Sequence, residues 1–448
     1  MTDRSDPTAA EEVASSFHIS ERAGHNYVHM RQWEFFEKSL ANPWTSDCPE
    51  GVVNLSVAEN SLMHKEVVEF ISKNLAVDPV HHLTYGSGPK GSPRLRKALA
   101  AFLNSHFQPR EQVQHEDILI LAGVTSVIDS LAWAICNEGE GIIVPYPFYL
   151  GFAVDIPTRA RAVIVPALFQ TLEDYKGFDD VFDPQMNIKS LEKALTEAKE
   201  KGIKSAEAVK EIASFCGQHE LHLISDEIYA NSVFENPRAS APVPFTSILT
   251  LDLADRIDSQ LVHVAYGASK DFCANGLRLG MLHTRNQGLQ AAVAGTRQDI
   301  WAKMLENEEY TGGFLAKNQR GLAEQYAFAT QFLDELGIPY YRNSNAGMFI
   351  WVDLRKYMTG EGEVANLSVH HLTPQDNEEY RRREGEIGAR FFANGVGIAM
   401  GSNFCTEELG WFRLTFSVSR EALEVGLQRM WKVLQATKQA GWKPGSDQ

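Results

Sequence analysis

Short apolar runs alternate with amphipathic stretches over much of the first two thirds of the chain. Apolar runs bounded by turn residues are typical of buried strands, and apolar positions three and four residues apart are typical of helices that cover a sheet. The pattern predicts helices over 93–107, 125–137, 188–202 and 206–220, and strands over 117–121, 141–145, 161–166, 221–225, 261–266 and 277–283. This alternation indicates an α/β fold with a mostly parallel sheet.

The last third of the chain has a different pattern. A long helical pattern from about residue 305 to 336 is followed by apolar runs at 347–354 and 411–418, a helix over 377–394 and a closing helix. This order predicts a smaller α+β domain. We expect the residues up to about Ser16 and the last six to be frayed termini. The expected division is 1–80 for an N-terminal arm and part of the small domain, 81–304 for the large domain and 305–448 for the rest of the small domain.

Composition narrows the function classes. The 448-residue chain carries a net charge of −16, which disfavours a general nucleic-acid binder because such proteins carry a basic surface. Its five cysteines are scattered without a CxxC pair, which excludes a disulfide framework or a thiolate zinc site and favours a reducing compartment. We see neither a signal peptide nor an apolar run of membrane-spanning length, so we expect no membrane partner and a cytoplasmic location.

A lysine follows the apolar run Val262–Gly267 in the segment VHVAYGASKDFCANGLRLGMLH. Such a lysine is often a solvated strand end. Here Ser269 precedes Lys270, and Arg278 follows within the same glycine-containing segment. A lysine amine becomes nucleophilic when it is partly desolvated or near other cations, and arginine is suited to holding phosphate. The combination favours a phosphorylated aldehyde held as a Schiff base.

Two further segments are candidates for the same site. In LISDEIYANSVF, Asp226 and Tyr229 follow a strand, where α/β sheets bind ligands. Asp226 could pair with a pyridinium nitrogen and Tyr229 could donate to a phenolic oxygen, although a helix N-cap at Asp226 is the simpler alternative. In LAGVTSVIDSLAWAI, a strand enters Gly123 and a helix begins near Thr125, which suits an anion as well as an ordinary capped helix.

Three motifs are less specific. GSGPKG at 86–91 matches GxGxxG but has no apolar strand before it. HELH at 219–222 straddles a helix end and a strand, so its imidazoles would not share a helix face, and we expect no metal. RRREGE at 381–386 is most simply a solvated helix face.

Together these segments resemble the fold-type I enzymes that use pyridoxal 5′-phosphate (PLP). YGASKDFCANGLRLG is similar to the Schiff-base segment of that family, and SDEIYA, VAEN and GWFRLTF occur in the family's order. The similarity runs from about residue 53 to 433. It is closest to 1-aminocyclopropane-1-carboxylate (ACC) synthase-like proteins and class I/II aminotransferases, in a form common in fungi.

The resemblance implies a role for each cofactor-side residue. Lys270 would form the Schiff base and carry the proton, Asp226 would pair with the pyridine nitrogen, and Tyr229 would bond the ring hydroxyl. Tyr149 in PYPFYLGF would stack on the cofactor ring. The cofactor phosphate would be held by Arg278, Ser269, Val124 and Thr125.

The resemblance also implies a substrate side and a partner. Arg413 in GWFRLTF would hold the α-carboxylate of an amino-acid substrate as a bidentate pair. Glu59 in VAEN matches the substrate-side glutamate of the ACC synthase-like branch. Tyr85 would reach the phosphate of the partner subunit and border the substrate, which implies a homodimer, although its spacing to Gly91 is one residue longer than in the plant enzymes.

The chain departs from the family pattern at two places. Family members have a strand that ends in a motif like NPxNPxG, whose asparagine bonds the cofactor ring oxygen. Relative to that pattern a segment is missing at Lys204–Ser205, where AKEKGIKSAEAVKEIASF joins two helices, and a second shortening lies near Thr296–Arg297. Neighbouring strands would keep unpaired backbone groups, each costing about 1–3 kcal/mol if buried. The sheet would have to close up or accept another strand.

Three functions stay open on the sequence alone. The broadest expectation is an aminotransferase. ACC synthase-like elimination, including C–S bond cleavage, begins in the same way and differs in what leaves afterwards. The third is an impaired or non-catalytic relative, because the missing strand reflects either absent coding sequence or a degenerate family member. The sequence does not indicate which amino acid is used.

Overall fold

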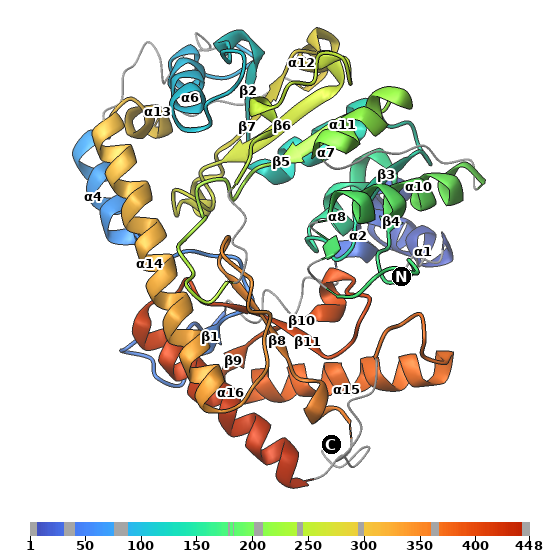
Figure 1. Ribbon diagram of the computed structural model, residues 1–448, viewed down its shortest axis with the longest axis vertical. Coiled ribbons are helices and arrows are strands. Elements are labelled where there is room, and N and C mark those ends of the chain that lie inside the picture. The colour runs from blue at the N-terminus through green and yellow to red at the C-terminus, as the bar shows by residue number, and fades with distance from the viewer. Residues whose placement is uncertain are drawn as a thin grey trace.

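The computed structural model describes residues 7–30, 41–75, 88–177, 180–181, 183–200, 209–239, 245–293, 300–359 and 367–440. Tyr85 and both positions of apparent shortening, Lys204–Ser205 and Thr296–Arg297, lie outside these ranges. Figure 1 shows two parts, which we call the large unit, built on strands β2–β7, and the small unit, built on β1 and β8–β11.

The main sheet of the large unit has four strands in the order β2-β7-β6-β5. Only β7 runs against its neighbours, and β5 and β6 are parallel with Asp226 opposite Ala265. Because β5 and β6 run in the same direction, Asp226 and the segment after Gly267 lie at the same edge of the sheet. The strands are β2 (Ile118–Leu121), β5 (Leu223–Asp226), β6 (Val262–Gly267) and β7 (Gly280–Thr284).

The other two strands of the large unit form a separate parallel pair, β3 (Gly141–Pro145) and β4 (Val163–Ala167). The predicted single sheet is therefore split, and Figure 1 shows its two pieces as separate groups of arrows. In the described residues the sheet has neither closed up nor accepted another strand, so β5 and β3 are both end strands. Ile142 in β3 and Ile224 in β5 are only half-buried, as expected beside such a break.

Helix α7 (Val124–Ile135) connects the two pieces through two apolar faces. Val127 and Leu131 pack with the core of the four-stranded sheet, whereas Ile128 and Ala132 pack with Val144 of the two-stranded sheet. Other helices surround the large unit: α6 (Pro93–His106), α8 (Phe152–Asp155), α9 (Pro157–Ala160), α10 (Pro184–Glu200), α11 (Val209–Gln218), α12 (Gln287–Val293) and α13 (Ile300–Leu305).

The small unit has its own core. Its antiparallel sheet has the order β10-β11-β8, and the early strand β1 pairs with β9, so the N-terminal region completes this unit. Phe412, Leu414 and Phe416 are fully buried beneath the covering helices. The elements are β1 (Val53–Asn54), α14 (Glu308–Glu335), β8 (Phe349–Asp353), α15 (Pro374–Ala393), β9 (Val396–Gly397), β10 (Ala399–Met400), β11 (Trp411–Thr415) and α16 (Arg420–Ala440). Helix α4 (His64–Asn74) follows β1 in the chain but buries Val67 and Phe70 in the core of the large unit.

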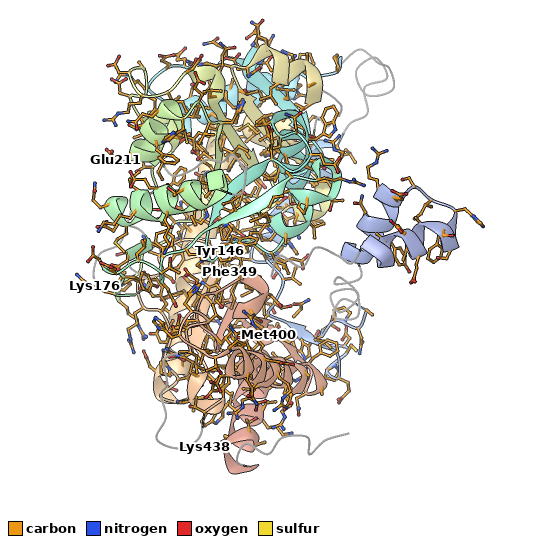
Figure 2. The ribbon with its side chains drawn as sticks, turned by 90° about the vertical axis from the view of Figure 1, so that its right-hand side faces the viewer. Tyr146, Lys176, Glu211, Phe349, Met400 and Lys438 are labelled. Carbon is orange, nitrogen blue, oxygen red and sulfur yellow. The ribbon has the colours of Figure 1, made fainter. Side chains whose placement is uncertain are left out.

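Two sequence expectations are wrong. The N-terminus is not frayed to Ser16 but forms the helices α1 (Pro7–Phe17) and α2 (Glu21–Met30), which stand to one side of the body in Figure 2. They pack closely because Ala10 and Ala14 are small and buried, and Gly24 leaves room for the α1 backbone. The 381–386 stretch is not wholly solvated either, because Glu384 is fully buried.

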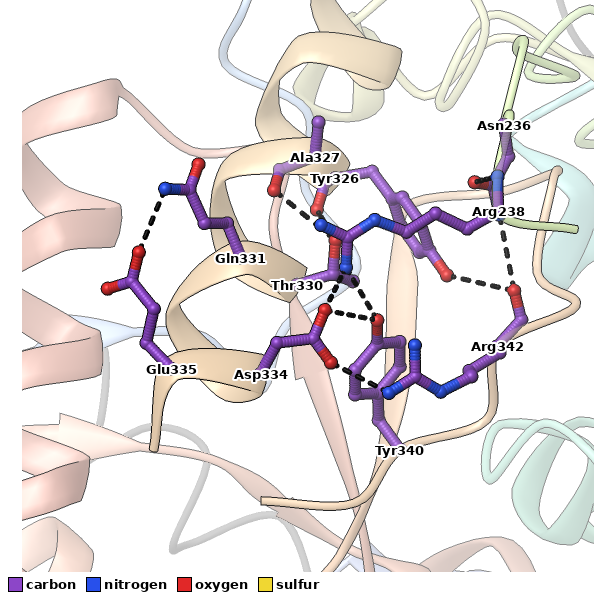
Figure 3. A network of polar contacts seen from close by, with 10 residues as sticks. All are labelled: Asn236, Arg238, Tyr326, Ala327, Thr330, Gln331, Asp334, Glu335, Tyr340 and Arg342. Atoms are coloured by element: carbon purple, nitrogen blue, oxygen red, sulfur yellow. Dashed lines mark hydrogen bonds and ion pairs between the residues drawn. The ribbon is translucent and has the colours of Figure 1, made fainter. Parts of the chain in front are cut away.

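A polar network ties the large unit to the small unit (Figure 3). Arg238, which follows β5 in the chain, pairs with Asp334 of α14 and lies 2.9 Å from the Tyr340 hydroxyl. Arg342 pairs with the same carboxylate at 2.8 Å, and Asn236 Nδ2 donates to the Ser344 carbonyl at 2.8 Å. The segment after Asp226 is therefore anchored on the small unit. Among the described residues no helix is long and apolar enough to cross a membrane.

Candidate active site

Lys270 lies just beyond the end of β6 and is half-buried. Its Nζ donates to the Ala58 carbonyl at 2.6 Å, which directs the amine toward the N-terminal part of the small unit. Burial lowers the pKa of Lys270 to about 8, and the positive charges of Arg413 and Arg278 add to this shift. Two carboxylates act in the opposite direction: Glu59 and Asp226. The amine thus lies between cations and anions and is neutral far more often than an exposed lysine.

The start of α7 and Arg278 form an anion-binding corner. Gly123 precedes the helix with φ +85°, and a Cβ at this position would lie 2.4 Å from Arg278 Nη2. Glycine therefore allows the guanidinium to lie against the free amide groups of the first helical turn, at Val124 and Thr125. Arg278 is exposed and its Nη1 donates to the Asn275 carbonyl at 2.9 Å. Ser269, also expected here, is buried directly before Lys270.

Asp226 ends β5 and no helix follows it, so the helix N-cap alternative is wrong. Its Oδ1 accepts a hydrogen bond from the Ile228 backbone at 3.3 Å. The residue has a water-accessible surface, yet burial raises the pKa of its carboxyl to about 6. Both observations fit a carboxylate at the bottom of a recess, surrounded by protein but open on one side. Nearby, burial also raises the pKa of Tyr229.

Tyr149 follows β3 and therefore comes from the other piece of the split sheet. Its side chain is 47% exposed, yet burial raises the pKa of its hydroxyl, and Asp226, Arg413 and Arg278 all act electrostatically on it. As for Asp226, the large exposed fraction and the raised pKa of Tyr149 are consistent with each other if the ring lines the recess. The site thus combines residues from both pieces of the large unit.

Arg413 lies in β11 and is buried between two aromatic rings. Its Cζ lies 4.1 Å from the Phe349 ring centroid and 4.2 Å from that of Phe404. One Nη donates to the Ser56 carbonyl at 2.6 Å, whereas Nε is buried without a hydrogen-bond partner. Burial lowers the pKa of Arg413 to about 10. Within the described ranges no carboxylate pairs with this guanidinium, so it could receive one from a ligand.

Glu59 borders the same recess from the small unit. Its Oε1 accepts from Asn275 Nδ2 at 2.9 Å, and the same asparagine offers its carbonyl to Arg278. Of the predicted site residues, Glu59, Asp226, Arg278 and Arg413 all act on the charge of Lys270. Tyr85 falls outside the described residues.

Sequence reasoning missed Asp155 at the end of α8. Burial raises the pKa of its carboxyl to about 7, Asp129 adds to the shift, and the Thr125 side chain opposes it. No pattern in PFYLGFAVD distinguishes this aspartate from a surface residue of a short helix. The aromatic neighbours of Arg413, Phe349 and Phe404, were missed for a similar reason, since they reach the arginine from different segments.

The chain belongs to the aminotransferase class I and II family, whose model matches residues 50–430. It is 28% identical to mouse "probable inactive 1-aminocyclopropane-1-carboxylate synthase-like protein 2" over 95% of this chain and 73% of that protein. It is 30% identical to the human protein of the same name, covering 87% and 68%, and 25% identical to 1-aminocyclopropane-1-carboxylate synthase 2 of Cucurbita pepo, covering 93% and 85%.

Solved structures share the fold. The aspartate aminotransferase from Thermus thermophilus with maleate aligns with a TM-score of 0.63 at 18% identity, over 93% of this chain and 99% of that one. The aromatic aminotransferase from Pyrococcus horikoshii aligns with a TM-score of 0.60 at 19% identity, over 88% and 97%. The chain therefore has the fold-type I architecture of PLP enzymes, as the sequence indicated.

The donor set fits PLP at several points. The corner made by Arg278 and the start of α7 is open only because Gly123 has no side chain, and it suits a phosphate. Lys270 and the recessed Asp226 are chemically suited to an aldehyde carbon and a pyridinium nitrogen. The asparagine of the NPxNPxG motif has no counterpart, so the ring oxygen would have one donor fewer.

Proposed function

We propose that this protein is a PLP-dependent enzyme that acts on an amino acid through Lys270, most simply as an aminotransferase. The observation that supports it most strongly is that Lys270, half-buried just beyond β6, lies where Asp226, Arg278 and Arg413 all act on its charge. A structural lysine would not need the guanidinium groups of Arg413 and Arg278 and the carboxylate of Asp226 around it. Together these side chains offer a group for the aldehyde, the pyridine nitrogen and the phosphate of PLP, and one for the α-carboxylate of an amino acid.

Each side chain would have one task. When bound, PLP supplies an electron sink for the pair left behind as the Cα proton departs. Lys270 would hold the aldehyde carbon and move the proton at Nζ, and Asp226 would keep a proton on the pyridine nitrogen. Arg278 and the start of α7 would hold the phosphate, and Ser269 and Thr125 would add hydroxyls. Tyr229 would donate to the ring oxygen.

The substrate side follows from Arg413 and Glu59. Arg413 would bind the α-carboxylate as a bidentate pair, with the rings of Phe349 and Phe404 packed against its guanidinium. Glu59 and the partner's equivalent of Tyr85 would border the substrate, with Tyr149 against the cofactor ring.

An absorbance spectrum provides the direct test. The purified chain mixed with PLP should develop a visible band that borohydride converts to a stable reduced adduct at Lys270, located by mass spectrometry of the digested protein. No band, or an adduct on another lysine, would refute the proposal. Incubation with a panel of amino acids then shows which product forms: keto acid for transamination, ammonia with keto acid for elimination, or ACC.

Elimination is the second candidate for the reaction. Its support is Glu59, which is held in place by Asn275 beside Lys270, and the relatives that are named as ACC synthases. Formation of ammonia or ACC in stoichiometric excess over transferred amino groups would favour it over transamination.

A non-catalytic PLP-binding relative is the third candidate. The split sheet favours it, and so do the relatives whose names include "probable inactive". A PLP band that forms normally while no amino acid is turned over would establish this alternative.

We also propose a homodimer acting on an amino acid, with no nucleic-acid partner. Tyr85 would then reach the phosphate in the partner's site. Sedimentation velocity at several concentrations should give twice the 50.0 kDa chain mass, and an active monomer would contradict the assembly.

A further inference from the structure

The segment Gly401–Glu407, which we call the bridging loop, lies between β10 and β11 of the small unit and contacts the β3–β4 piece of the large unit. Figure 2 labels Met400, directly before it, near the border between the units, with Tyr146 and Phe349 close by in that view. The loop is fixed to the small unit by Glu384, a fully buried residue of α15. Its carboxylate accepts from the Ser402 backbone at 3.3 Å and from the Gly410 backbone at 3.0 Å.

Glu407 fixes the same loop to the large unit. The residue is 6% exposed. One oxygen accepts from the Phe169 backbone at 2.9 Å, and the other accepts from the Gln170 backbone at 3.2 Å and contacts His370 Nε2 at 2.9 Å. Phe169 and Gln170 follow β4, so this carboxylate joins the small unit to the end of the two-stranded sheet. Charge-assisted hydrogen bonds to a buried carboxylate are stronger than neutral ones.

Phe404 connects the bridging loop to both halves of the proposed site. Its carbonyl accepts from the Phe148 backbone at 3.0 Å, one residue before Tyr149. Its ring covers one face of the Arg413 guanidinium at 4.2 Å. One residue therefore contacts the segment that carries the ring-stacking tyrosine and the arginine that receives the carboxylate.

We propose that Glu407 is a positioning residue that sets the separation between Tyr149 and Arg413 through the bridging loop. This inference rests on the proposed function. The β3–β4 piece has no hydrogen-bonded strand between it and β5 in the described residues, so its place depends on α7 and on contacts such as this one. When Glu407 is lost, the loop and Phe404 are free to shift, and the carboxylate site changes while the phosphate corner at Arg278 does not.

The test compares Glu407→Gln with Glu408→Gln in the PLP-loaded protein. Glu408 is the matched control, because it lies in the same segment and pairs with Arg355 at 2.6 Å and Trp411 Nε1 at 2.7 Å, away from β4. In Glu407→Gln the amide nitrogen faces a backbone N–H in either orientation, that of Phe169 or that of Gln170. The ligand is 2-aminoisobutyrate, which has an α-carboxylate but no Cα hydrogen, so its binding is measured by PLP absorbance without turnover.

We expect Glu407→Gln to weaken 2-aminoisobutyrate binding about tenfold, corresponding to about 1.4 kcal/mol, with PLP affinity within about twofold of wild type. Glu408→Gln should change neither by more than about twofold at a similar thermal midpoint. Phe404→Leu retains an apolar side chain but loses the aromatic face, and should weaken the same ligand without weakening PLP.

Equal effects of Glu407→Gln and Glu408→Gln on 2-aminoisobutyrate would overturn the inference, and so would a loss of PLP affinity that matches the loss of ligand affinity. Neither result contradicts the proposed function, provided that the wild-type protein binds both PLP and 2-aminoisobutyrate. A wild-type protein that binds no PLP overturns the proposed function, and the inference with it.

Discussion

The two pieces of the split sheet contribute unequally to the site. The four-stranded piece and the loops around it provide Lys270, Asp226 and Arg278, whereas the two-stranded piece provides Tyr149 and Asp155. Of the groups proposed to bond to the cofactor, Lys270 follows β6, which is paired on both sides, whereas Asp226 ends β5, which borders the break. Among the described residues the break leaves the two-stranded piece with less support, since each of its strands is paired on one side only. A chain with this break in its sheet can keep its reactive groups in place while the two-stranded piece opposite them is held less firmly.

The largest effect should come from Lys270 on the four-stranded piece. Lys270→Ala removes the amine proposed to react, and turnover should fall by a factor on the order of 10⁴ or more, because proton transfer alone is worth about 10²–10⁴. The borohydride-stable adduct should vanish as well, as measured by intact mass. Lys270→Arg retains a cation of similar length and serves as the control for folding. Turnover of Lys270→Ala at the wild-type rate would exclude the proposed chemistry.

The pH dependence of PLP capture provides a second strong test of the same lysine. Only the neutral amine reacts, and burial lowers the pKa of Lys270 to about 8. The capture rate of the PLP-free protein should therefore rise about tenfold per pH unit below pH 8 and level off above it, whereas an ordinary lysine would continue to rise to about pH 10. Stopped-flow absorbance measures this rate. A profile that still rises steeply between pH 9 and 10 would show that Lys270 is not desolvated in solution.

Sequence reasoning predicted which strand-end residues lie close together better than it predicted what surrounds them. Lys270 and Asp226 were identifiable because each follows a short apolar strand, and parallel strands bring such residues to one edge. Strand β3 was predicted with its observed bounds, Gly141–Pro145, because turn residues flank it. Asp155 and Phe404 were not identifiable, since their importance arises from contacts between segments distant in the chain. The packed α1 helix was missed because its few buried alanines are a weak signal.

A third test addresses Arg413, which belongs to neither piece of the sheet. Truncating one partner of a buried charge pair costs about 2–5 kcal/mol, so Arg413→Ala should raise the KM for amino acids by roughly 30-fold or more. Arg413→Lys should restore part of the affinity, because an ammonium lacks the planar fork. PLP affinity should survive both changes, because Arg278, not Arg413, is proposed to hold the phosphate. Titrating PLP and amino acid separately into each variant shows which of the two ligands Arg413 binds. Loss of PLP affinity alone would show that the proposed roles of Arg278 and Arg413 are reversed.

Hydrogen exchange compares the two pieces directly. Backbone amides of β3, such as Ile143, should exchange at least about tenfold faster than those of β6, such as Val264, because a two-stranded sheet has little stability of its own and β6 has a strand on each side. Amide exchange followed by mass spectrometry can resolve the two segments. Equal protection would mean that α7 and the bridging loop hold the two-stranded piece as firmly as a neighbouring strand would. The two pieces would then not differ in stability.

The smallest effect should come from Tyr149, because the two-stranded piece contributes packing rather than bonds to the cofactor. An aromatic stack is worth about 0.5–1.5 kcal/mol, so Tyr149→Leu should weaken PLP binding by roughly 2- to 10-fold, and Tyr149→Phe should leave it almost unchanged.

Tyr146→Leu is the control, since Tyr146 lies in the same segment but its ring packs 5.0 Å from Phe148. This variant tests whether loosening the segment is by itself enough to weaken PLP binding. Absorbance titration measures the PLP dissociation constant of each variant for this comparison. If Tyr149→Leu and Tyr146→Leu weaken PLP equally, the ring of Tyr149 has no specific stacking role. If Tyr149→Leu weakens PLP as much as the loss of Arg278 does, the wall made by the two-stranded piece is as important for the cofactor as the piece that carries Lys270.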